Sequence, residues 1–128
     1  MALAEPNYIH GGDDMTILEI FEKVNLVIPI EQRVFFNFFA DTVNELQSLY
    51  RDFVFVKGKE YTPPERLNDD DYEFVVLPLY HNAIVDNILF LANKGEFYKS
   101  EFLRKSKDAY LKYWNDNAKG RRIRRMRW

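Results

Sequence analysis

The sequence predicts an all-α fold, a small four-helix bundle-like domain with a minor extended or hairpin insertion between its second and third helices. Apolar residues recur at helical spacing in four segments, and Pro or Gly lies between these segments. The chain has 128 residues, of which 47% are hydrophobic, so it is long enough for one core and too short for two ordinary domains. We therefore expect a single helical domain.

The predicted organisation has three parts. Residues 1–14 contain Pro6, Gly11 and Gly12 among polar residues and lack periodicity, which is typical of a flexible N-terminal arm. Residues 15–118 form the helical domain, and residues 119–128 form a flexible, basic C-terminal tail. No internal repeat interrupts this arrangement.

The first two helices are predicted from a start signal and a break. Thr16 followed by Glu19 makes a capping box, which opens a helix that ends near Asn25. Pro29 then disfavours helical geometry, so a second helix begins at about Ile30 and runs to Tyr50.

The remaining segments follow in order. The alternation of Phe53, Phe55 and Lys57 before the turn residue Gly58 predicts a short extended segment or a small hairpin, followed by a surface loop. A buried third helix covers Pro78–Ala92, and a fourth covers about Glu96–Asn117, after which Gly120 ends it. The expected core residues are Phe35, Phe39, Leu46, Ile84, Ile88, Phe102 and Tyr110.

The charge is distributed unevenly along the chain. Residues 1–103 carry 8 Lys and Arg against 18 Asp and Glu, whereas residues 104–128 carry 10 against 2. The net charge of -2 therefore conceals an acidic body and a basic end. Such asymmetry favours a partner that presents phosphate or an acidic protein surface.

Catalytic, cofactor and metal sites are not expected. There are no cysteines, and the nucleotide-binding and serine-hydrolase motifs are missing. His10 and His81 are both interpreted as surface residues. The run Asp69–Asp71 is typical of a solvated loop that caps a helix, and a cation site is the less favoured alternative because the run lacks EF-hand spacing.

Targeting signals are not evident in the sequence. The first residues have neither a basic nor an apolar signal region, and no apolar run approaches the length of a membrane span. We expect a protein that is cytosolic at synthesis and does not contact membranes.

The basic end carries the candidate site. Arginine suits phosphate or carboxylate, and a terminal Trp suits stacking or insertion into a pocket. A purely solubilising tail is the less favoured interpretation, because Met and Trp are poor residues for that purpose. The candidate partner contacts are Lys119, Arg121, Arg122, Arg124, Arg125, Met126, Arg127 and Trp128.

The order of these parts resembles the head–tail adaptor, or connector, proteins of tailed bacteriophages. The similarity covers roughly residues 15–117 and involves layout and short patterns: TILEI, NELQSLY, LPLYHNAIV and FYKSEFLRKSKDAYLKY. The N-terminal arm and the loop with Pro63, Pro64 and Asp69–Asp71 do not match the family pattern.

The resemblance implies a non-enzymatic virion protein that assembles as a ring, commonly a dodecamer, beneath the portal and continues the DNA channel. Its partners would be the portal protein, tail or stopper proteins, further copies of itself and, through non-specific contact, the packaged DNA. By this analogy the C-terminal tail would dock on the portal or line the channel, and the protein would be located at the head–tail interface of the virion.

Two alternatives remain open from the sequence. One is a small nucleic-acid-binding regulator, although the acidic body opposes DNA and no helix-turn-helix with a basic recognition helix is evident. The other is a different phage or host assembly factor, such as a tail chaperone or a scaffold-binding module.

Overall fold

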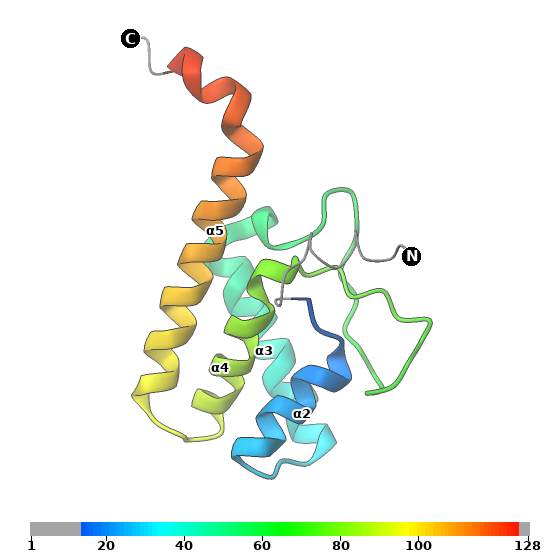
Figure 1. Cartoon of the computed structure of the whole chain (residues 1–128). Helices are drawn as coiled ribbons and strands as arrows, with labels where there is room; N and C mark the ends of the chain where they lie inside the picture. The colour runs from blue at the N-terminus through cyan, green and yellow to red at the C-terminus, as the bar shows by residue number, and fades with distance from the viewer. Residues whose placement is uncertain (1–13, 126–128) are drawn as a thin grey trace, which may run out of the picture.

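The computed structural model describes residues 14–125, with backbone alone for residue 52 and residues 116–125. The described chain is helical, which confirms the all-α class (Figure 1). Its α-helices are α2 (Ile17–Val27), α3 (Gln32–Tyr50), α4 (His81–Leu91) and α5 (Glu96–Arg125), with the short 3-10 helices η1 (Arg51–Val54) and η2 (Pro78–Tyr80).

Helix α2 starts at the predicted capping box. The Thr16 hydroxyl accepts a hydrogen bond from the Glu19 N–H at 3.1 Å, and the Glu19 carboxylate accepts one from the Thr16 N–H at 2.8 Å. These two bonds satisfy donors that the first turn of a helix leaves unpaired. The helix ends at Val27, two residues beyond the predicted end, and the extended backbone of Ile28 leads into Pro29.

Helix α4 lies at the centre of the bundle. It packs against α2, α3 and α5, and Figure 1 shows it between α5 and the pair formed by α2 and α3. Because neighbours cover it on several sides, even its polar residues Asp86 and Asn87 are buried. This confirms the prediction of a buried third helix, and Pro78 lies in η2, directly before its first turn.

The core consists largely of aromatic and branched side chains. Six of the seven predicted core residues have no exposed surface: Phe35, Phe39, Leu46, Ile84, Ile88 and Phe102. The seventh, Tyr110, is only half-buried, so its assignment to the core was wrong. It lies at the edge of the core instead, where its ring stacks on Tyr50 with 5.0 Å between centroids.

The segment between α3 and α4 contains a minimal antiparallel pairing. Phe55 bridges Val76, with the Val56 N–H bonded to the Val75 carbonyl at 2.8 Å and the Leu77 N–H to the Val54 carbonyl at 2.9 Å. Of the two predicted forms, the short extended segment is found and the local hairpin is not, because Phe55 pairs with Val76 at the far end of the loop. Gly58, with φ of 81°, makes the expected turn.

Helix α5 is longer than predicted. It begins at Glu96, after Gly95 with φ of 109°, and continues to Arg125, so Gly120 does not end it. A glycine inside a helix costs only about 1 kcal/mol, and the flanking Lys and Arg residues are good helix formers. Its 30 residues correspond to a length of about 45 Å. Figure 1 shows its C-terminal part extending past the rest of the bundle.

Candidate docking helix at the end of α5

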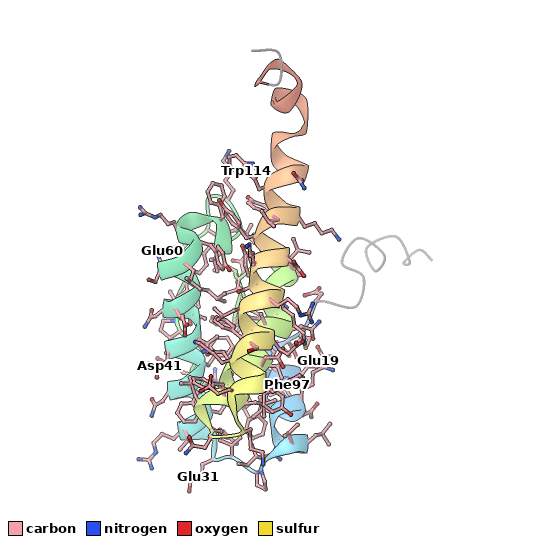
Figure 2. All side chains as sticks on the ribbon, turned by 90° about the vertical axis from the view of Figure 1, so that its left-hand side faces the viewer. Glu19, Glu31, Asp41, Glu60, Phe97 and Trp114 are labelled. Atoms are coloured by element: carbon pink, nitrogen blue, oxygen red, sulfur yellow. The ribbon has the colours of Figure 1, made fainter. Side chains whose placement is uncertain are left out.

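An aromatic cluster holds α5 where it leaves the bundle. Phe53 of η1 lies 5.7 Å from Tyr110, 6.0 Å from Tyr113 and 5.5 Å from Trp114, measured between ring centroids, and each pair is edge-to-face. Figure 2 shows Trp114 near the upper end of the packed part of α5. Such ring pairs contribute about 0.5–1.5 kcal/mol each beyond the area they bury. The cluster therefore fixes the direction in which α5 continues.

The α5 extension, residues 116–125, begins just beyond this cluster. Its backbone is helical and adds about 15 Å to the part of α5 that packs on the bundle. Successive helical positions differ by about 100°, so the basic residues of this stretch are distributed around the axis rather than along one face. The basic residues on it are Lys119, Arg121, Arg122, Arg124 and Arg125.

The structure thus places five of the eight predicted site residues on one helix. The other three, Met126, Arg127 and Trp128, lie outside the described residues. The predicted tail from residue 119 is therefore, as far as Arg125, a continuation of α5 rather than a separate segment.

Three of the positive charges nearer the start of α5 have acidic partners. Lys99 pairs with Glu45 of α3, and Lys105 pairs with Asp86 of α4 at 2.7 Å. The Arg104 guanidinium lies 2.6 Å from the Glu101 carboxylate.

Beyond Asp116 the sequence supplies six basic residues and no acid. No carboxylate of the same segment is therefore available to neutralise these six charges. Lys107 and Lys112 of the packed part are exposed as well, but the basic residues of α5 are densest in its last two or three turns and in the residues that follow.

The ion pair between Lys105 and Asp86 is the most buried one in the described part of the chain. The Asp86 side chain is 10% exposed. Burial raises the pKa of Asp86, while the hydrogen bond and charge of Lys105 act in the opposite direction. The pair joins α4 to α5 and helps to hold the packed part of α5, which precedes the extension, on the bundle.

A polar network that was not predicted from the sequence joins three helices. The Asn87 amide of α4 donates to the Thr42 hydroxyl of α3 at 2.9 Å, and Lys99 of α5 donates to the Asn87 carbonyl oxygen at 3.2 Å. Asn87 and Thr42 are fully buried. A polar Asn within the apolar run of a buried helix was the available signal, because a buried amide requires partners.

The histidine prediction was wrong for His81. The ring is 1% exposed, and both nitrogens have backbone partners: the Met15 N–H bonds to Nδ1, and Nε2 lies 2.9 Å from the Val76 carbonyl oxygen. The ring also stacks on Phe74 with 4.4 Å between centroids. The surface prediction for His81 failed because Met15, 66 positions away in the sequence, contacts the ring only in the folded chain. His10 lies outside the described residues.

The acidic run Asp69–Asp71 forms a local turn. The Asp69 carboxylate accepts a hydrogen bond from the Asp71 N–H at 3.0 Å, and the Asp69 carbonyl accepts one from the Tyr72 N–H at 3.1 Å. The prediction that this run caps a helix was wrong, because α4 begins only at His81. Within residues 14–125, no group of three or more His, Asp or Glu side chains is placed to hold a metal ion.

Comparisons with known proteins give no match: no family model, no curated protein and no solved structure is detectably similar to this chain. In the described part of the chain, none of the helices combines the length and apolarity needed to cross a bilayer.

Proposed function

We propose that this chain is a non-enzymatic connector protein of a tailed-bacteriophage virion, which forms a ring under the portal and docks through the basic end of α5 on the portal or along the DNA channel. The observation that carries the proposal is the α5 extension. A helix held by an aromatic cluster continues past the bundle with basic residues and no acid beyond Asp116.

The electrostatics support docking on an anionic partner. Three earlier cations of α5, Lys99, Arg104 and Lys105, are paired with Glu45, Glu101 and Asp86. The longest run of basic residues without an acid lies at the C-terminal end of the chain. A basic end on an acidic body also favours head-to-tail packing of identical copies, and such packing closes into a ring when the rotation between copies permits it.

The groups that suggested chemistry have structural roles in the bundle. His81 is held by two backbone partners, Asp86 by Lys105, and the carboxylate of Asp69 closes its own turn. The proposal therefore assigns the protein no reaction and no cofactor.

The test mixes the full-length protein with the portal protein encoded in the same genome. Size-exclusion chromatography with light scattering measures the mass of each species, alone and mixed. We expect a complex whose mass corresponds to a ring of this chain on the portal, and we expect deletion of Gly120–Trp128 to abolish it while the far-ultraviolet circular dichroism remains helical.

A matched pair of variants separates docking from general charge effects. Arg121→Gln with Arg122→Gln removes two positive charges from α5, and Arg33→Gln with Arg66→Gln removes two from exposed positions elsewhere on the bundle. Docking predicts weaker portal binding for the first pair alone. Equal binding by both pairs would contradict it.

Duplex DNA of random sequence tests the nucleic-acid alternative. Five neutralised phosphates would give a log–log salt slope of about -4 to -5, because each contributes about -0.9. We expect only weak binding at physiological salt, since the acidic body repels the duplex. The nucleic-acid-binding regulator would be favoured instead if the protein bound DNA tightly and formed no portal complex. That DNA binding would also have to depend on the five arginines of the basic end: Arg121, Arg122, Arg124, Arg125 and Arg127.

A further inference from the structure

A pocket of about 740 Å³ lies between the start of α2 and the loop that precedes α4. Its apolar lining comes from both sides: Ile17 and Leu18 belong to α2, and Leu67 and Phe74 belong to the loop. Binding pockets for small ligands have a volume of about 300–1,000 Å³ and largely apolar walls. This pocket therefore has room for a few side chains at the end of a segment, but not for a whole helix.

The charged residues that line the pocket are mostly acidic. Four carboxylates face one guanidinium: Asp14, Glu19, Asp69 and Asp70 against Arg66. The Arg66 guanidinium lies 3.5 Å from the Asp69 carboxylate, so these two charges offset each other. Asp14 and Asp70 are exposed. A segment that combines cationic and apolar side chains is therefore complementary to this pocket.

The C-terminal end of the chain has this composition. In Gly120–Trp128, five arginines are interspersed with Ile123, Met126 and Trp128, and no acid follows Asp116. Arginine pairs well with carboxylates, and large apolar side chains are typical anchors in apolar pockets. Residues 1–13 adjoin the pocket in the sequence, but they contain two acids and no Lys or Arg. The basic end is therefore the better match.

The basic end of the same bundle is placed away from this pocket. Figure 1 shows α4 between α5 and α2, and the α5 extension leads away from the bundle. Trp114 packs on Phe53 with 5.5 Å between ring centroids, which fixes this direction. Because α5 would have to turn back to reach its own pocket, the occupant that fits is the basic end of another copy. A contact between two different surfaces of identical chains builds rings or open chains.

We propose that the pocket between α2 and the loop receives the basic end of α5 from a second copy of this chain, with the arginines beside the carboxylates and the apolar side chains inside. The inference rests on the proposed function in one respect, namely that the basic end of α5 is a docking element, and it names a partner other than the portal. One basic end cannot fill a pocket and contact the portal at the same time. Portal binding therefore competes with this contact.

The experiment measures self-association of the full-length protein by sedimentation velocity over a range of protein concentrations, without the portal. We expect association that weakens as the salt concentration rises, because salt screens exposed ion pairs. Asp14→Asn with Asp70→Asn should weaken it about three- to tenfold, since two exposed ion pairs are lost. The matched control, Asp41→Asn with Asp108→Asn, removes the same charge from exposed positions outside the pocket and should weaken it much less.

Two outcomes of this experiment would contradict the proposal. One is a full-length protein that is monomeric at every concentration, and the other is equal weakening by the two pairs of substitutions. If the variant at Asp14 and Asp70 fails to fold, amide chemical shifts of the full-length protein at low and high concentration locate the contact instead. We expect the amides of Leu18 and Leu67 to shift on association. Unchanged shifts at both would contradict the proposal.

Mixing two defective chains tests which surfaces meet. The chain that lacks Gly120–Trp128 retains the pocket, and the chain with Asp14→Asn and Asp70→Asn retains the basic end. Each should associate weakly alone, whereas the mixture should form one-to-one pairs that do not grow further. If the truncated chain associates as strongly as the full-length chain, the proposal is wrong, and residues 1–13 or another surface fill the pocket.

The portal separates this inference from the proposed function. A chain that binds the portal but does not self-associate would refute the inference alone. A chain that self-associates through the pocket but forms no portal complex would refute the proposed function alone.

Discussion

Trp114 of α5 packs edge-to-face on Phe53 of η1, with ring centroids 5.5 Å apart and ring planes at 89°. Phe53 also contacts Tyr110 and Tyr113, so one side chain supports α5 over its last packed turn. We expect Phe53→Ala to lower the free energy of unfolding by about 2 kcal/mol, less than a fully buried Phe would lose. Urea titration followed by Trp fluorescence measures the loss. Phe97→Ala, at a Phe that is 66% exposed, is the control and should stay within about 0.5 kcal/mol.

Phe39 tests whether the buried face of α3 is assigned correctly. Its ring has no exposed surface and contacts the rings of Phe35 and Phe74. Removing such a ring leaves a cavity, so Phe39→Ala should cost about 3–5 kcal/mol in unfolding free energy. Leu26→Ala, at a side chain that is 86% exposed, should change stability by less than about 0.5 kcal/mol. Comparable losses in the two variants would contradict the assigned core.

The capping box of α2 predicts a graded effect. Thr16→Ala removes the acceptor for the Glu19 N–H and should cost about 1 kcal/mol. Glu19→Gln retains an oxygen that can accept from the Thr16 N–H, so it should cost less. Thermal or chemical unfolding of the two variants gives the comparison. A larger loss for Glu19→Gln would mean that the charge at the helix start matters more than the reciprocal bonds.

Asp86 predicts a pH dependence of defined sign. Burial raises the pKa of its carboxyl above the value in the unfolded chain, so its contribution to stability is greatest at low pH and declines as the pH rises through the folded-state pKa. The stability of Asp86→Asn relative to the wild type should therefore increase from about pH 4 to pH 7. Asp108→Asn, at an exposed carboxylate of α5, should show little change over this range. A relative stability of Asp86→Asn that falls with pH would contradict the assigned direction.

Local signals in the sequence were sufficient for most helix positions. Three of these signals act within a few residues: the capping box at Thr16, the proline at Pro29 and the glycine at Gly95. The helices begin or end near them. Gly120 was misjudged because its helical cost is small compared with the helix propensity of its neighbours.

Long-range contacts were beyond local reasoning. The pairing of Phe55 with Val76 and the burial of His81 both depend on how the loop between α3 and α4 folds back on the bundle. The basic character of the site was evident from the sequence, whereas its helical form up to Arg125 was not. Three earlier cations of α5 pair with Glu45, Asp86 and Glu101. These pairs depend on helix packing and on side-chain rotamers, which the sequence pattern does not give.

The most direct test of the central claim is the infectivity of particles assembled with a truncated chain. A phage genome whose copy of this gene lacks Gly120–Trp128 is complemented with either the full-length gene or the truncated one, and filled heads, tails and joined particles are counted by electron microscopy alongside the titre. Docking through the end of α5 predicts normal joining with the full-length gene, and filled heads with unattached tails with the truncated one. Joined particles and a normal titre from a truncated, folded protein would contradict the account.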